Sequence, residues 1–374
     1  MSHPTDSHDS QPDTTPQTPN PDPPPARVKW EVLSLVVLIT SAMMLALVPD
    51  WSEVLSFGGD DDDEPEPVEV GYAWEQFPAA GPGPRANYSL AFDHHRGQFV
   101  LFGGIARWDD PHVDTWEWAA GWTLQVPATA PPARDLGLLV YFPPTDAVVL
   151  FGGRDLPAGV AFDDTWTYNG EVWTQLSPVT SPGPRFSTCG TYDAARGQLI
   201  LFGGEHIDGT KLAETWAYDG QTWTQFTPDP VPPARALCAM AYDPVRERAV
   251  LFGGLGTDGT LGDTWEWDGA AWQQVEPATA PSARMGAAMI YHAGLGQILL
   301  YGGDSGACGT LANQTWTWDG AAWAAPDIPD AGPRSVFGMA YDPERDLVLL
   351  YGGWSGGTGE CAVNDTTYVL RASE

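Results

Sequence analysis

Residues 249–275 read AVLFGGLGTDGTLGDTWEWDGAAWQQV. This segment holds an apolar strand that ends in Gly253-Gly254, then a polar loop, a Thr-Trp-x-Trp strand and an Asp-Gly turn before Trp272. An Asp-Gly pair between two short strand-like runs is typical of a tight hairpin. A further strand begins upstream at Arg235. The pattern therefore predicts a unit of four short antiparallel strands.

The same unit recurs along the chain with a spacing of 49 to 51 residues. A Gly-Gly pair closes an apolar strand six times, beginning at Gly103, Gly152, Gly203, Gly253, Gly302 and Gly352. An arginine keeps the same period, at Arg85, Arg134, Arg185, Arg235, Arg284 and Arg334. A late tryptophan does so as well, at Trp74, Trp122, Trp173, Trp223, Trp272 and Trp323. Four strands in a period of about 50 residues are typical of a propeller blade.

The ends of the repeat region predict how the ring closes. The first element, residues 72–77 around Trp74, matches a fourth strand, and the last, residues 365–370, matches a third. We therefore expect an all-β, six-bladed β-propeller closed by this N-terminal strand, with Trp74 beside Tyr368. Such closure removes the open edges of the sheet array.

The Gly-Gly strand ends, the Thr-Trp strands and the trailing tryptophans resemble the Kelch repeat, the propeller family of galactose oxidase. The resemblance covers residues 71–374 and fits a membrane-anchored, bacterial-type member. It implies a β-propeller fold. It also implies a function, since Kelch propellers mostly bind other proteins, while a minority are enzymes and some six-bladed ones act on sialic acid.

The N-terminal 70 residues have a different composition. Residues 1–27 are rich in proline and poor in apolar residues, which predicts a disordered tail. Residues 28–50 contain an uncharged apolar run, 32–48, with Arg27 and Lys29 close before it and acids after it. This predicts a transmembrane signal-anchor helix with a cytoplasmic N-terminus and an extracytoplasmic propeller, in the periplasm or at the cell surface. A cleaved signal peptide and a buried helix are the alternatives.

Residues 51–70 include the acidic run 60–64 and predict an extended stalk, with a calcium site as the poorer interpretation. Acids outnumber bases 49 to 17, which gives a net charge of −32. A nucleic-acid partner is therefore excluded, because binding phosphates requires a basic surface.

The repeated residues are expected to build the scaffold. Fourteen of the 18 tryptophans occupy repeat positions and are expected in the core. The six strand-opening arginines are expected to pair with the acids that precede the Thr-Trp strands, which are Asp114, Asp164, Glu214, Asp263 and Asp365. Gln314 replaces the acid in the fifth repeat, where we expect only a neutral hydrogen bond.

Binding residues are expected where the repeat is broken, in the loops after the second strands. Trp108 and Trp354 are the propeller's two tryptophans outside the repeat and belong to its first and last blades, which are neighbours in a closed ring. Two exposed indoles side by side predict a binding platform, together with Asp110 and His112. The alternative is that each indole folds onto its own loop.

No catalytic residue, metal ligand set or cofactor site is predicted, since the histidines show no ligand spacing. Cys308 and Cys361 lie in loops of adjacent blades and are expected to form a disulfide in an exported protein. Cys189 and Cys238 are expected to be separate, buried thiols on opposite strand faces.

The sequence thus predicts a membrane-tethered module that recognises a protein or a cell-surface polymer through its variable loops. A carbohydrate-active enzyme of the sialic-acid-epimerase-like Kelch type is one alternative. A structural component of an envelope complex is the other.

Overall fold

The computed structural model describes residues 71–78, 80–306, 310–357 and 360–372. The tail, membrane helix and stalk expected for residues 1–70 lie outside this described part. Among the described residues, no helix is long and apolar enough to cross a membrane.

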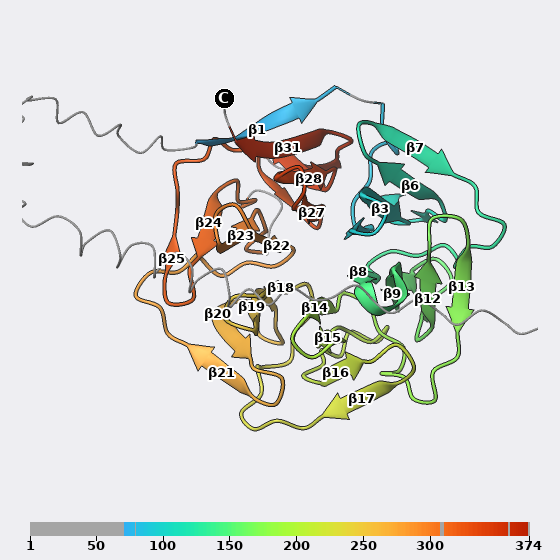
Figure 1. Ribbon diagram of the computed structural model, residues 1–374, viewed down its shortest axis with the longest axis horizontal. Coiled ribbons are helices and arrows are strands. Elements are labelled where there is room, and N and C mark those ends of the chain that lie inside the picture. The colour runs from blue at the N-terminus through green and yellow to red at the C-terminus, as the bar shows by residue number, and fades with distance from the viewer. Residues whose placement is uncertain (1–70, 79, 307–309, 358–359, 373–374) are drawn as a thin grey trace, which may run out of the picture. The chain divides into compact units, whose positions relative to one another are not determined.

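Six four-stranded antiparallel sheets form the propeller and are arranged in a ring about a central axis (Figure 1). The all-β prediction is confirmed. In the first five blades the strands follow chain order from the axis outward. Because neighbouring strands of a blade are antiparallel, the loops after the second and fourth strands open on one face, which we call the loop face. The tight turns after the first and third strands open on the opposite face, the turn face.

The strands at equivalent positions have similar lengths and sequences. The innermost strands are β2 (Ser89–Asp93), β8 (Leu138–Phe142), β14 (Cys189–Asp193), β18 (Ala239–Asp243), β22 (Ala288–His292) and β27 (Gly338–Asp342). The second strands are β3 (Gln98–Phe102), β9 (Ala147–Phe151), β15 (Gln198–Phe202), β19 (Arg248–Leu255), β23 (Gln297–Tyr301) and β28 (Leu347–Tyr351). The third strands are β6 (Thr115–Trp118), β12 (Thr165–Tyr168), β16 (Thr215–Tyr218), β20 (Thr260–Trp267), β24 (Thr315–Trp318) and β31 (Thr367–Ala372). The outer strands are β7 (Trp122–Gln125), β13 (Trp173–Leu176), β17 (Trp223–Phe226), β21 (Trp272–Val275), β25 (Trp323–Ala324) and β1 (Tyr72–Phe77).

The N-terminal strand β1 completes the last blade. It pairs antiparallel with β31, so the sixth sheet has the order β1-β31-β28-β27 (Figure 1). The pairing register places Trp74 opposite Leu370 and Gln76 opposite Tyr368. Trp74 thus lies two residues from its predicted neighbour. All six blades are complete within residues 72–372, so this segment is a self-contained folding unit.

The trailing tryptophans join neighbouring blades. Five of them donate their indole N–H to a third-strand threonine of the preceding blade, the one directly before the Thr-Trp tryptophan or, in the last blade, before Tyr368. These pairs are Trp122–Thr367 (2.9 Å), Trp173–Thr115 (2.9 Å), Trp223–Thr165 (3.1 Å), Trp272–Thr215 (2.8 Å) and Trp323–Thr264 (3.0 Å). At the closing strand, the buried Trp74 indole nitrogen and Thr315 hydroxyl have no hydrogen-bond partner among the described residues. The core role predicted for these tryptophans is confirmed by their burial.

Four of the predicted arginine–acid pairs are present. The pairs join Arg85 to Asp114 (2.8 Å), Arg134 to Asp164 (2.6 Å), Arg185 to Glu214 (2.7 Å) and Arg235 to Asp263 (2.7 Å). In each of these blades the same carboxylate also accepts the indole N–H of the Thr-Trp tryptophan. The acid therefore connects a buried arginine to the third strand.

The prediction is wrong in the last two blades. Arg284 binds the Ser282 hydroxyl and the Gly302 carbonyl, and none of its hydrogen bonds is with Gln314 in the described part of the chain. Arg334 lies over the Tyr368 ring at 4.9 Å and makes no pair with Asp365 among the described residues. The reason is register, because Thr366 occupies the position of the acid directly before the strand.

The repeated Gly-Gly pairs permit a close crossing between blades. The Gly104 N–H donates to the carbonyl of Arg134 in the next blade at 3.0 Å. Gly103 has a φ of 69°, and a Cβ on it would lie 2.5 Å from the same carbonyl oxygen. Only glycine fits a left-handed position with so little space. The equivalent contact recurs in every blade, ending with Gly353 to Arg85.

A disulfide corrects the prediction for two cysteines. Cys189 at the start of β14 and Cys238 next to β18 are bonded to each other, with their Cα atoms 5.6 Å apart. Their positions along the strands predicted that the two side chains point to opposite strand faces. The two residues belong to adjacent blades, however, whose innermost strands β14 and β18 pack against each other. Cys308 and the side chain of Cys361 lie outside the described part, so their pairing stays a prediction.

Candidate functional site: an axial funnel on the loop face

Short ribbons carry the loops that follow the second strands. In three blades these loops form extra strands, which are β4 (Ile105–Arg107) with β5 (Asp110–Pro111), β10 (Arg154–Asp155) with β11 (Val160–Ala161), and β29 (Trp354–Gly357) with β30 (Glu360–Val363). β29 also pairs with β26 (Arg334–Ser335), which places Trp354 opposite Ser335. In every blade, the first residue after the Gly-Gly pair bridges antiparallel to the residue that follows the strand-opening arginine.

A closed ring of backbone hydrogen bonds surrounds the axis at the position two residues after each strand-opening arginine. The N–H of each member donates to the carbonyl of the member in the preceding blade, at 2.6 to 3.1 Å. The members are Asn87, Leu136, Ser187, Leu237, Gly286 and Val336. All six have φ between 48° and 63°. A left-handed conformation costs on the order of 1–3 kcal/mol for each non-glycine residue. Such strain is typical of a functional position.

A cavity of about 360 Å³, which we call the funnel, lies on the axis and is lined by residues from all six blades. Ring residues such as Leu136, Leu237 and Val336 contribute its apolar lining. Phe186, Met285 and the two tryptophans of the loops add aromatic and apolar surface, while Arg154, Glu205 and Asp304 add charge. An apolar cavity of this size with a few polar groups is the usual form of a ligand site.

Trp108 and Trp354 stack on each other at the mouth of this cavity. Their ring centroids are 5.0 Å apart and the planes differ by 21°. The Trp354 indole N–H donates to the Asn87 side-chain oxygen at 3.2 Å, which fixes its orientation. Trp108 stays 55% exposed. The structure therefore brings together the two indoles that the sequence singled out, while their role in binding stays a prediction.

A connected set of side chains extends from the indoles around the mouth. Asn87 also donates to buried Asp135 at 3.0 Å, and Asp135 accepts from Arg154 at 3.0 Å. The Arg154 guanidinium lies 4.5 Å from the centre of the Phe186 ring. Burial raises the pKa of Asp135 above its ordinary value although Arg154 acts in the opposite direction. These contacts hold the walls of four blades in fixed relative positions.

Asp110 and His112 lie outside the cavity lining. Asp110 is exposed in β5. The His112 backbone binds Gly104 and Arg134, which makes this residue part of the contact between two blades. Burial and the nearby Arg85 lower the pKa of His112. A contribution of either residue to binding stays a prediction.

Sequence reasoning missed the other residues of the funnel. The repeat does hold a signal for some of them: the position directly after the invariant Gly-Gly pair varies from blade to blade. The residues at that position are Ile105, Arg154, Glu205, Leu255, Asp304 and Trp354. Comparing the six repeats at this position would have found three of the missed cavity residues, Arg154, Glu205 and Asp304, because a scaffold position would repeat as the glycines do.

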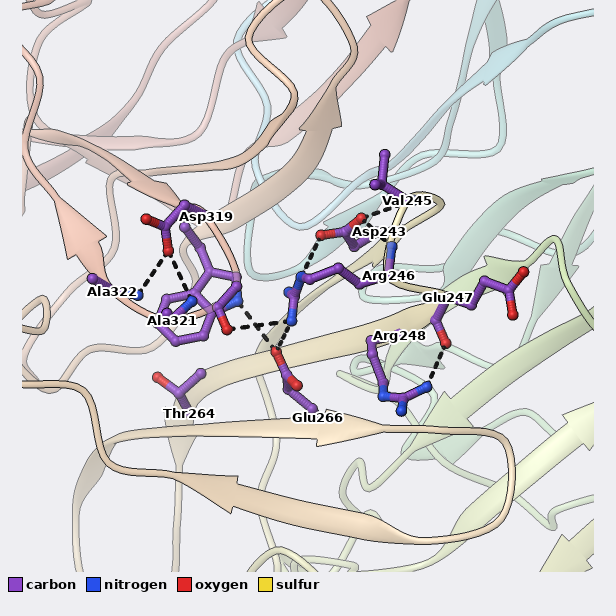
Figure 2. Close-up of polar contacts among 12 residues, drawn as sticks. Asp243, Val245, Arg246, Glu247, Arg248, Thr264, Glu266, Asp319, Ala321 and Ala322 are labelled. Atoms are coloured by element: carbon purple, nitrogen blue, oxygen red, sulfur yellow. Dashed lines mark hydrogen bonds and ion pairs between the residues drawn. The ribbon is translucent and has the colours of Figure 1, made fainter.

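The turn face is built differently, around a second set of arginines. Arg246 donates to Asp243 at 2.9 Å and to Glu266 at 2.5 Å, as Figure 2 shows. It also reaches the Gly320 carbonyl in the hairpin of the next blade at 3.4 Å. Arg96, Arg196 and Arg345 pair in the same way with Asp93, Asp193 and Asp342. These arginines stabilise the turns.

A second axial cavity, of about 500 Å³, opens among the innermost strands and their turns. Its lining is mostly apolar, with Leu90, Val140 and Ile290 on the strands and tyrosines such as Tyr192 and Tyr291 nearer the turns. In the part of the chain that the structure describes, no three His, Cys, Asp or Glu side chains are placed to hold a metal ion.

The ring of four-stranded sheets, closed by an N-terminal strand around an axial funnel, defines a six-bladed β-propeller. Residues 145–316 match the family model described as the KLHDC2/KLHL20/DRC7 Kelch-repeats domain. Together with the repeat pattern and the fold, this match supports a Kelch-repeat β-propeller.

Among solved structures, the chain is similar to the one titled "Structure of YjhT", with a TM-score of 0.60 and 16% sequence identity. The alignment covers 76% of this chain and 95% of that one. At this identity the similarity shows the fold alone. No curated protein sequence matches the chain.

Proposed function

We propose that the propeller is a recognition module that binds a protein or a cell-surface polymer at the mouth of the loop-face funnel. The stacked pair Trp108 and Trp354 is the observation that supports this proposal. A half-exposed indole beside a cavity offers a large, rigid contact surface at a small cost in side-chain entropy. Binding hot spots are enriched in such residues.

The proposal is tested by capture of partners from an envelope extract with the immobilised protein. We expect the Trp108→Ala/Trp354→Ala variant to lose at least 90% of the captured partner, since each hot-spot residue contributes about 2 kcal/mol or more. The control variant is Trp166→Phe, because Trp166 lies in a third strand away from the funnel. Equal capture by the double variant and the wild type would remove the proposed site.

We further propose that residues 28–50 tether the propeller outside the cytoplasm. The uncharged run 32–48 between basic and acidic flanks supports this topology. The Cys189–Cys238 disulfide also supports it, because disulfides persist mainly in oxidising compartments.

The tether has a direct test in cell fractionation. The full chain should sediment with membranes, whereas a chain lacking residues 32–48 should not. Thiol trapping during lysis should leave Cys189 and Cys238 unlabelled until a reductant is added. A soluble full chain, or free thiols at both positions, would contradict the proposed location.

A carbohydrate-active enzyme is the second candidate. One observation favours it: Asp135 is a buried carboxyl with a raised pKa at the funnel wall, and such groups are typical of active sites. Its oxygens, however, are held by Asn87 and Arg154. This arrangement agrees better with a structural role in the mouth.

A further inference from the structure

The loop face carries a strong excess of acids. The loops after the second strands contain nine acids and three bases. These loops are residues 105–113, 154–163, 205–213, 255–262, 304–313 and 354–364. The connections that leave the fourth strands add Asp229, Glu276, Asp327 and Asp330 and no base. The charge of this face is therefore far from balanced.

The few bases of the loops are already engaged with acids. Arg154 pairs with Asp135 at 3.0 Å and Lys211 with Glu205 at 2.7 Å. Arg107 lies 3.6 Å from Asp109, and both side chains are more than three-quarters exposed. The turn face carries five arginines, Arg96, Arg196, Arg246, Arg248 and Arg345, but it also carries many acids, among them Asp219, Asp268 and Asp319. The loops at the funnel nevertheless have a clear excess of negative charge of their own.

The indole pair adds a second, independent feature to this negative face. The faces of tryptophan rings carry negative charge density and attract cations, most often arginine. Trp108 is 55% exposed and Asp109, next to it in sequence, is 77% exposed at its side chain. A flat guanidinium group on the indole would have a carboxylate beside it. An acidic partner would be repelled by this carboxylate, and a neutral one would gain no charge attraction from it.

We propose that the partner of the funnel is a basic protein segment, one of whose arginine or lysine side chains stacks on the Trp108–Trp354 pair. This inference rests on the proposed function and names the chemistry of the partner. The surrounding carboxylates attract the segment over a distance, and the indoles select its cationic side chain. The cavity behind the pair accepts the aliphatic part of the same side chain or of a neighbour.

The test measures binding of a labelled, end-capped peptide with four arginines to the full chain by fluorescence anisotropy. A peptide with citrulline at the same four positions is the probe control, because citrulline keeps the shape of arginine and loses its charge. We expect the arginine peptide to bind at least tenfold more tightly, and its binding to weaken several-fold between 50 and 300 mM salt, since exposed charges are screened.

Two variants separate the indole contact from general attraction to an acidic protein. Trp108→Leu keeps the net charge and should weaken binding of the arginine peptide about tenfold. Glu171→Gln removes an exposed acid from a turn-face hairpin and should leave binding within a factor of two. Both variants retain residues 1–70, so the acidic run 60–64 contributes equally to every measurement.

Each outcome decides the inference. Equal affinity of the arginine and citrulline peptides, or unchanged affinity in Trp108→Leu, would overturn it. Stronger binding of a neutral oligosaccharide than of the arginine peptide would overturn it in favour of a sugar stacked on the indoles. If envelope capture depends on Trp108 and Trp354 but the arginine peptide does not compete, the basic-segment inference fails while the recognition function stands.

Discussion

Replacing Arg235 with alanine should lower the free energy of unfolding of the propeller by about 3 kcal/mol, the cost of removing one partner from a buried ion pair. Arg235 is fully buried and binds both carboxylate oxygens of Asp263 at 2.7 Å. Burial favours the neutral form of Asp263, but the bonds from Arg235 and its charge dominate and hold the pKa below its ordinary value of 3.8. Without the arginine, a carboxylate would remain poorly solvated.

Arg284→Ala is the matched control for Arg235→Ala. Both arginines bind the first carbonyl of a Gly-Gly pair at 3.0 Å and a carbonyl two residues upstream at 2.9 Å. Of the two, only Arg235 has an acid partner among the residues that the structure describes. Urea denaturation of residues 71–374 at pH 7, followed by tryptophan fluorescence, should show a smaller loss for Arg284→Ala. Equal losses would mean that the carboxylate contributes nothing.

The difference between these two arginines marks the limit of sequence-based prediction for this fold. The repeat predicts the blades, their number and the closing strand, because these depend on residues that recur six times. It also predicts five arginine–acid pairs, of which four are present. It fails where a single residue departs from the pattern, since Asp365 is offset by one position from the acids it was taken to match. Thr366 fills that position instead.

The funnel shows a second limit. Trp108 and Trp354 could be found from sequence because tryptophan is rare outside the repeat, and blade order placed them in neighbouring loops. Phe186 and Met285 of the cavity lining could not, and nor could Asp135, which is bonded to Asn87 and Arg154, since they are ordinary residues whose position beside the axis depends on the left-handed turn that follows them. The Cys189–Cys238 bond was missed for a similar reason, because it forms between sheets and not within one.

A propeller that begins at residue 78 should not form a stable ring. Removal of β1 leaves the sixth blade with three strands and exposes the edge of β31, which invites aggregation. It also removes Trp74, which is 8% exposed and packs 5.4 Å from the Tyr301 ring. Loss of a buried aromatic side chain alone costs about 3–5 kcal/mol. Since domains are stable by only about 5–15 kcal/mol, we expect no cooperative unfolding transition for residues 78–374.

Moving the strand, and not deleting it, tests whether ring closure is its role. β1 runs antiparallel to β31 and begins opposite Ala372, where β31 ends. Residues 72–77 placed after residue 372 through an Asp-Gly turn would therefore form a hairpin like the one that joins the third and fourth strands of the fourth blade, β20 and β21, but two residues longer on each strand. This permuted chain should regain the melting temperature of residues 71–374 to within a few degrees, and Trp74→Ala should destabilise both chains equally. A cooperative unfolding transition in residues 78–374, which lack the strand, would contradict a closure role for β1. Failure of the permuted chain to fold would contradict it as well.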